Sequence, residues 1–598
     1  MPAVRSGRRR LKVVRKGNRL EHFPNLVAMF LDRVAQRGDT PFLWAKRDGR
    51  WQSISYTEAA RQVAALSQSL LELGLKPGDR VMLVSENRPE WLIADLAIMA
   101  AGCVTVPTYT TNTTRDHTHI LSNSGARAVV VSNQKLAKTL IPAVLFSSDC
   151  HDVIGIEDIR TGQPVNGAKF HIWSDLVASG GSLDDVRARV SGIGRDDLAC
   201  LIYTSGTGGA PRGVRQHHGA ILHNTAACID VIANDFGWDD EVFLSFLPAS
   251  HAYEHSGGQM FPIALGAQIY FAESLEKLAA NIEEVRPTLM VVVPRLFEML
   301  RQRMLKTIEK QGGIGAKLLA RALEIGKERY DKGSIPIKDW PADLAVRLLL
   351  KRKVSQKFGG RIKAMVSGGA PLNPDVGLFF HSLGITMLQG YGQTEAGPVI
   401  SCNRPKNGIR METVGPPLLD TEVRFAEDGE LLVRGELVMH GYWNNDEETA
   451  RVLKDGWLHT GDVGHFDDGG RIVITDRKKD LIVNDKGDNV SPQRVEGMLT
   501  LQPEIAQAMV YGDRRPHLVA LLVPEPDVKG DEATIRAKLQ KAVDRVNAEL
   551  SVVEKVRRFT LADEAFSVDN EQMTPSMKIR RHVLKQAYGE RLDALYGK

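Results

Sequence analysis

Short apolar segments alternate with helical patterns along most of the chain, and this order restricts the possible folds more than any other feature. Apolar runs such as Arg80–Val84 and Arg127–Val131 are typical of buried strands, and a helical pattern starting at Asn87 reaches Ala101 between them. The same order recurs over residues 242–293. Parallel strands need a crossover that is usually a helix, so the alternation predicts an α/β fold of parallel sheets covered by helices.

The pattern changes along the chain in a way that predicts several domains, as expected for 598 residues. Residues 24–76 show helical spacing, and a long polar helical insert occupies roughly 296–358. Short alternating strands over about 420–475 predict a small antiparallel β subdomain at the end of a large domain, 21–475. Residues 476–598 combine strands and helices and predict a small, mobile α+β C-terminal domain.

Composition is that of an ordinary globular protein, with 43% hydrophobic and 25% charged residues and a net charge of +4, so no nucleic-acid partner is expected. The positive charge is concentrated at the N-terminus, where residues 1–20 contain eight Lys and Arg side chains and no acid. This basic arm suits peripheral contact with anionic lipid at the inner face of a membrane, and it equally suits a solubilising tail.

Five scattered cysteines without ligand spacing predict a reduced cytoplasmic protein with neither disulfides nor a zinc site. No apolar segment follows the basic arm as it would in a secretory signal. The most apolar long stretch, Trp91–Val106, contains Asp95 and is too short to span a bilayer. The oligomeric state stays open, and a homodimer is compatible with the sequence.

A loop rich in glycine and hydroxyl groups, reading YTSGTGGAPRGV over Tyr203–Val214, follows the apolar strand Leu198–Ile202. Glycines let backbone N–H groups approach an anion, the hydroxyls add donors, and Arg212 adds a permanent cation. The spacing is not that of a Walker loop. A single loop of this kind is most often a solvated connection, but the motifs downstream favour a phosphate site. Its proposed contacts are Thr204, Ser205, Gly206, Thr207, Gly208 and Arg212.

Two further motifs, Ser367–Pro371 and Gln389–Glu395, each follow a predicted strand. The ends of parallel strands converge on one crevice, so both motifs can face the glycine loop. Tyr391 offers a flat ring to a purine, Thr394 a hydroxyl to a phosphate, and Glu395 a hard oxygen ligand to Mg²⁺. A glutamate in this position can also simply complement a helix N-terminus, and the surrounding motifs favour the functional interpretation.

A fourth motif, Gly456–Gly464, contains Asp462, whose carboxylate could accept the two hydroxyls of a ribose or could simply form a turn. A fifth, Thr475–Asp480, is a charge run that in isolation is typical of a solvated surface.

Taken in this order, the five motifs resemble the adenylate-forming superfamily of acyl-CoA synthetases, luciferases and peptide-synthetase adenylation domains, over nearly the whole chain. The phosphate loop departs twice from the usual YTSGTTGxPKG, at Gly208 and Arg212, and Arg212 keeps the charge. The resemblance implies ATP, Mg²⁺ and coenzyme A as cofactors, with Mg²⁺ at Glu395 and Thr204. It implies nucleotide contacts from Gly369, Ala370, Gln389, Gly390, Tyr391, Gly392, Thr394, Asp462, Ile474, Arg477 and Lys578.

The resemblance also implies a hinge at Asp476, a catalytic Lys578 and a pantetheine tunnel near Gly487. Lys578 would stabilise charge during adenylation, and the C-terminal domain would turn between two half-reactions. At the tunnel, Lys486 and Asp488 replace residues that are commonly Gly and Lys in the family.

The segments Leu247–Glu254 and Pro294–Glu298 look like those of long-chain fatty acyl-CoA synthetases. His251 would lie near the substrate carboxylate, or be a core histidine bonded to backbone. We therefore expect an ATP-dependent long-chain fatty acid:CoA ligase. One alternative is another adenylating ligase, which would act on a medium-chain or aryl acid or transfer its acyl group to a carrier protein. The other is a binding or transport protein that has this fold and has lost catalysis.

Overall fold

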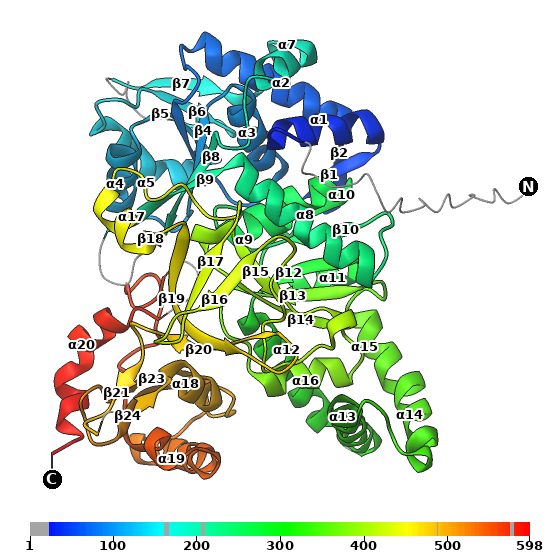
Figure 1. The fold of residues 1–598 in the computed structure, drawn as a ribbon, viewed down its shortest axis with the longest axis vertical. Coiled ribbons are helices and arrows are strands. Elements are labelled where there is room, and N and C mark those ends of the chain that lie inside the picture. The colour runs from blue at the N-terminus through cyan, green and yellow to red at the C-terminus, as the bar shows by residue number, and fades with distance from the viewer. Residues whose placement is uncertain are drawn as a thin grey trace, which may run out of the picture.

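The computed structural model describes residues 23–160, 167–204, 210–311, 313–486, 488–574 and 579–597. Two predominantly parallel sheets form the large domain (Figure 1). The seven-stranded sheet runs, in spatial order, β7 (Lys169–Ile172), β6 (Asp152–Gly155), β5 (Ala126–Val131), β3 (Arg80–Val84), β4 (Val104–Thr108), β8 (Leu198–Thr204) and β9 (Arg212–His217). The eight-stranded sheet runs β15 (Val399–Cys402), β14 (Met387–Gly392), β13 (Ala364–Ser367), β12 (Leu289–Val292), β10 (Val242–Ser245), β11 (Gln268–Phe271), β1 (Pro41–Arg47) and β2 (Arg50–Ser55).

Antiparallel pairing occurs only at the edges of these two sheets, where β8 pairs with β9, β1 with β2, and β14 with β15. The expected parallel, helix-covered α/β fold is therefore confirmed. The helices connecting and covering the strands are α1 (Leu26–Arg37), α2 (Tyr56–Glu72), α3 (Pro89–Ala100), α4 (Thr114–Ser124), α5 (Gln134–Leu145), α6 (Trp173–Ala178), α7 (Leu183–Val190), α8 (His218–Asp235), α9 (Ala252–Glu254), the π-helix η2 (His255–Met260), α10 (Phe261–Leu265), α11 (Leu278–Val285) and α16 (Pro374–Ser382).

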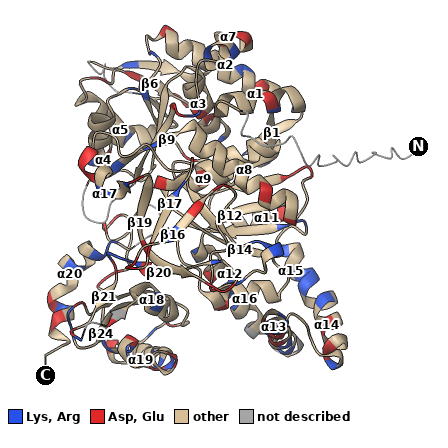
Figure 2. Ribbon diagram, viewed as in Figure 1, with Lys and Arg blue, Asp and Glu red and all other residues tan. Residues whose placement is uncertain are grey.

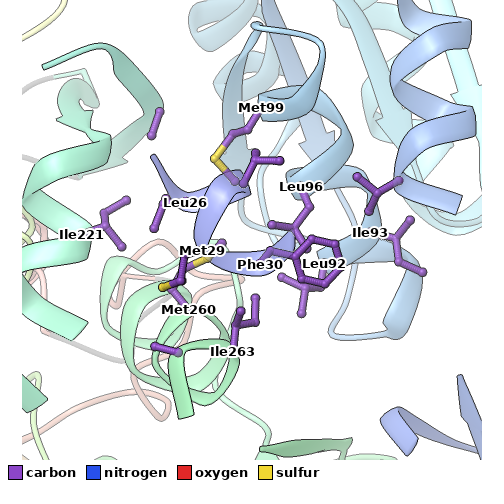
Figure 3. Packing of buried hydrophobic residues seen from close by; sticks show 14 of the residues in the cluster. Leu26, Met29, Phe30, Leu92, Ile93, Leu96, Met99, Ile221, Met260 and Ile263 are labelled. Atoms are coloured by element: carbon purple, nitrogen blue, oxygen red, sulfur yellow. The ribbon is translucent and has the colours of Figure 1, made fainter. Parts of the chain in front are cut away.

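The core of the large domain lies where helices from distant parts of the chain meet (Figure 3). Phe30 on α1 and Leu92 on α3 are buried in one cluster with Ile263 on α10. Helix α3 is buried along its whole length, which explains why its sequence is apolar on every side. Of its two acids, Glu90 lies in the first turn, and Asp95 is fully buried beside His255, with Oδ2 2.9 Å from the imidazole Nε2. Among the described helices none is both long and apolar enough to cross a membrane.

The structure corrects one local expectation. Residues 24–76 are not helical throughout, because the hairpin of β1 and β2 separates α1 from α2. Asp48 and Gly49 both have positive φ (49° and 73°), the conformation of a two-residue hairpin turn. Trp44 stacks on Tyr270 of β11 with ring centroids 4.9 Å apart, which attaches the hairpin to the sheet.

Antiparallel strands follow the large sheets, as expected: β16 (Glu422–Phe425), β17 (Glu430–Arg434), β18 (Leu453–Lys454), β19 (Trp457–Phe466) and β20 (Ile472–Arg477), with α17 (Asp446–Val452) between the second and third. The chain then enters a compact C-terminal region with its own hydrophobic core. This region contains β21 (Ile482–Val483), β22 (Asn489–Val490), α18 (Pro492–Thr500), β23 (Ile505–Tyr511), β24 (Leu518–Pro524), α19 (Glu532–Glu549), β25 (Val556–Leu561) and α20 (Arg581–Ala594).

The helical insert between β12 and β13 comprises α12 (Pro294–Gln311), α13 (Ile314–Lys332), α14 (Trp340–Val346), the π-helix η4 (Arg347–Lys351) and α15 (Arg352–Lys357). It projects from the large domain at the lower right of Figure 1, beside the C-terminal region.

Candidate active site

One cavity of about 2270 Å³ is lined by strand ends of both large sheets, by the β subdomain and by the C-terminal region. Every predicted site residue within the described part of the chain lines it: Thr204, Arg212, His251, Gly369, Ala370, Gln389, Gly390, Tyr391, Gly392, Thr394, Glu395, Asp462, Ile474 and Arg477. The predicted residues Ser205, Gly206, Thr207, Gly208, Gly487 and Lys578, and the basic arm 1–20, lie outside the described residues.

Asp462 is the centre of a polar cluster built from three strands. Its Oδ2 accepts a hydrogen bond from the Tyr391 hydroxyl at 2.6 Å, and its Oδ1 accepts one from Arg477 Nε at 3.0 Å. The carboxylate raises the pKa of Arg477, whereas burial, followed by the same carboxylate, raises the pKa of the Tyr391 phenol well above its ordinary value. The cluster therefore presents a carboxyl acceptor, a phenol and a cation together, which suits a sugar diol beside a flat base.

Arg212 lies at the other end of the glycine loop from Thr204, and the two residues are direct partners on β9 and β8. Its guanidinium forms an ion pair with Glu448 on α17 and lies over the Tyr442 ring, 4.9 Å from the centroid. Both contacts orient the cation at the cavity wall, where a phosphate could compete with Glu448 for it.

Glu395 follows β14 in the short 3₁₀ helix η5 (Thr394–Ala396), and its Oε1 accepts a hydrogen bond from the Tyr442 hydroxyl at 2.8 Å. Burial, followed by Glu395, raises the pKa of Tyr442, so the phenol stays a donor to the carboxylate. The carboxylate of Glu395 and the hydroxyl of Thr204 are hard oxygen donors on the same cavity, a donor set that fits Mg²⁺.

Two glycines keep the cavity wall free of side chains. A Cβ at Gly368 would lie 2.8 Å from the Tyr253 ring, and one at Gly392 would lie 1.8 Å from the Pro398 carbonyl oxygen. The Tyr253 hydroxyl donates to the Val366 carbonyl at 2.7 Å, which holds this ring against Gly368. A larger residue would displace the Tyr253 ring at Gly368 and the Pro398 backbone at Gly392.

His251 is partly buried, bonded to backbone and on the cavity wall. Its Nδ1 accepts a hydrogen bond from the Tyr253 backbone N–H at 3.1 Å and caps the short helix α9, while the residue also lines the cavity. The cap sets the tautomer at Nδ1, so any contact with substrate would come from the other side of the ring.

Apolar side chains from α8 and the eight-stranded sheet line one part of the cavity, which we call the apolar branch. Its lining residues include Cys228, Val231, Ile232, Phe243, Phe261, Leu289, Val291, Val399, Cys402 and Leu418. The branch and the polar cluster belong to one cavity, so a ligand with a polar head and an apolar tail could occupy both.

Tyr442 and Glu448 are site residues that sequence reasoning did not find. Their partners, Glu395 and Arg212, lie far away in the sequence, so no spacing links them. The sequence signal near Glu448 was that of a helix start, because Asn445 caps α17 and three acids follow in its first turn.

Comparison with known proteins agrees with this geometry. Residues 30–443 match the AMP-binding enzyme family, and residues 479–598 match the AMP-binding enzyme C-terminal domain. The chain is 32% identical over 603 residues to the long-chain-fatty-acid–CoA ligase FadD15 of Mycobacterium tuberculosis, covering 96% of this chain and 97% of that protein. It is 30% identical over 596 residues to the peroxisomal long chain acyl-CoA synthetase 7 of Arabidopsis thaliana, covering 92% and 82%.

The fold also matches the A domain of a carboxylic acid reductase from Segniliparus rugosus, solved with AMP and a co-purified carboxylic acid. The TM-score is 0.76 at 22% identity, over 96% of this chain and 94% of that one. Fold and cavity thus define an adenylate-forming enzyme, and the chain belongs to the AMP-binding enzyme family. Its class is that of the AMP-forming acid–thiol ligases, and the expected resemblance is confirmed.

Proposed function

We propose that the protein is an ATP-dependent long-chain fatty acid:CoA ligase. The observation that carries the proposal is the single cavity that joins the polar cluster around Asp462 to the apolar branch along α8. An aryl acid would need only a short pocket, whereas an alkyl chain can use the full branch. The long-chain ligases among the relatives support the same substrate class.

In the proposed first step, a substrate carboxylate oxygen attacks the α-phosphorus of ATP. A new P–O bond forms, the bond to the bridging oxygen breaks, and pyrophosphate leaves with that electron pair. Asp462 and Arg477 would hold the ribose, Tyr391 the base, and Arg212 the phosphates, so catalysis rests on positioning and charge stabilisation. Glu395 and Thr204 would hold Mg²⁺, whose charge would offset that of the phosphates.

In the second step, the thiolate of CoA attacks the acyl carbon, and AMP leaves as the mixed anhydride breaks. We propose that Lys578 serves the first step and the region of Gly487 the second, with the C-terminal domain turning about Asp476 between them. Burial raises the pKa of Asp476, and its Oδ2 is buried without a hydrogen-bond partner. A buried carboxyl oxygen without a partner at this point is compatible with a second arrangement of the hinge. The five free cysteines support a reduced, cytoplasmic location.

The test is a panel of acids offered with ATP, Mg²⁺ and CoA, in which AMP release and the thioester are both measured. Palmitate and oleate should outperform octanoate and benzoate. A preference for benzoate would contradict the long-chain assignment. AMP release that requires a phosphopantetheinyl carrier protein in place of CoA would favour the carrier-protein alternative.

A further inference from the structure

Exposed apolar side chains are concentrated on one short stretch of the helical insert. Ile337, Trp340, Leu344, Leu348 and Leu349 are 77, 60, 55, 59 and 56% exposed. Trp340, Leu344 and Leu348 follow one another at intervals of four, so they form one row along α14 and η4. Scattered exposed apolar residues are ordinary on a protein surface, but a contiguous row on a projecting helix indicates an interaction surface.

The opposite face of α14 packs against the rest of the protein. Val346 is completely buried in the hydrophobic cluster that the insert shares with the eight-stranded sheet. Asp343 forms an ion pair with Arg329 of α13 at 2.9 Å, and Asp339 forms one with Arg321 of the same helix. The acids are therefore neutralised on the inner side, and the apolar row faces away from α13.

Basic side chains continue from the exposed row. Arg347, Arg352 and Lys353 are exposed, and no acidic residue occurs between Arg347 and Lys357. Lys357 is also exposed, but it is ion-paired with Glu283 of α11 at 2.8 Å. Figure 2 shows this blue segment along α15 and η4, at the outer edge of the molecule. The exposed surface thus combines an apolar row with positive charge. This combination is typical of helices that lie in the interface of an anionic membrane.

We propose that α14, η4 and α15 form a membrane-docking surface that inserts Trp340, Leu344 and Leu348 among anionic lipids. The tryptophan ring suits the headgroup level, and the basic side chains would contact lipid phosphates. A second copy of the chain is not the expected partner of this surface, because two such faces in contact would bring like charges together. The protein would lie on the membrane, and the surface gives it access to apolar substrates dissolved there.

The test is flotation of the full chain with vesicles of phosphatidylcholine containing phosphatidylglycerol. We expect Leu344→Gln/Leu348→Gln to weaken vesicle affinity by at least about tenfold, because two apolar side chains no longer enter the interface. Phe146→Gln/Val552→Gln is the matched control, since these residues are 80 and 73% exposed elsewhere, and it should bind as wild type. Arg352→Glu/Lys353→Glu should weaken binding to anionic vesicles and reduce its salt dependence.

The basic arm is present in all these variants, so a contribution from residues 1–20 cancels. Equal binding by wild type and both substituted insert variants would overturn the proposal, as would equal binding to vesicles of phosphatidylcholine alone. The proposal would also be overturned if wild type self-associates without binding vesicles and the leucine variant no longer self-associates. That result would assign the face to a second copy of the chain. The assay uses neither ATP nor CoA, so its failure leaves the proposed ligase activity untouched.

Discussion

Asp462 and Arg477 face each other as cross-strand partners on β19 and β20, with the guanidinium Nε 3.0 Å from the carboxylate Oδ1. The pairing register of the β subdomain thus determines where the proposed ribose acceptor points. Tyr391 reaches the same carboxylate from β14 of the large sheet. One carboxylate therefore links two structural units.

Asp462→Asn should raise the KM for ATP by at least about tenfold, because an amide is a weaker acceptor and attracts Arg477 less. ATP–pyrophosphate exchange measures this effect. Asp455→Asn is the control, since Asp455 is an exposed turn residue of the same subdomain with φ of 52° that Asn tolerates. An unchanged KM in Asp462→Asn would argue against the ribose assignment.

Arg212→Gln should also raise the KM for ATP, by about tenfold, because the cation at the phosphate loop is lost. Arg212→Lys should recover most of the activity, since Lys keeps the charge, although it loses the fork that pairs with Glu448. Initial rates at varied ATP distinguish the two variants. Equal activity of Gln and Lys variants would mean that the charge of Arg212 is not used.

Cys228→Phe should shift the preferred acid toward shorter chains, because the larger ring would occupy the apolar branch beside α8. The ratio of palmitate to octanoate activity should fall at least about tenfold, while the KM for ATP stays unchanged. Cys228→Ser keeps the volume and should retain the wild-type ratio. An unaltered ratio in the Phe variant would place the acyl chain elsewhere.

Lys578→Ala should abolish pyrophosphate exchange and still allow supplied acyl-adenylate to react with CoA, because the charge is needed only in the first step. A bulky residue at Gly487 should do the reverse, sparing adenylation and blocking thioester formation. The two half-reactions are assayed separately in both variants. Equal loss of both steps in either variant would contradict its assigned role.

Glu254 should make stability depend on pH, because complete burial raises the pKa of this carboxyl from 4.5 to about 8. Its Oε1 accepts a hydrogen bond from Ser245 at 2.6 Å, and its Oε2 is buried without a partner. Above pH 4.5 the unfolded chain releases a proton that the folded protein keeps, so the group's contribution is greatest below pH 4.5 and is lost as pH rises toward 8.

The Glu254→Gln variant removes this titration and should become more stable relative to wild type as pH rises from 5 to 8, by up to about 1.4 kcal/mol per pH unit. Urea unfolding at several pH values measures the difference. Glu276→Gln, a fully exposed site, should show no such trend. Parallel stability curves for wild type and Glu254→Gln would show that the buried carboxyl is ionised.

Much of the fold could be predicted because the relevant signals are local. Apolar strand runs and helical spacing predicted the parallel sheets, and short alternating strands over about 420–475 predicted the β subdomain. The hairpin at Asp48 and Gly49 was missed although its turn dipeptide is diagnostic, because helical spacing on both sides outweighed it. Tyr442 and Glu448 could not be predicted, since their partners are distant in the sequence.

The sequence by itself determined which side chains leave the ends of strands, and with them the phosphate loop, Tyr391 and Asp462, because strand ends are local features. Only the tertiary structure decided that Asp462 meets Tyr391 and Arg477, that Glu448 holds Arg212, and that an apolar branch adjoins them. The same holds for the exposed row on α14. Spacing sets which residues share a face, but strand order, register and helix packing decide which faces meet and which stay uncovered.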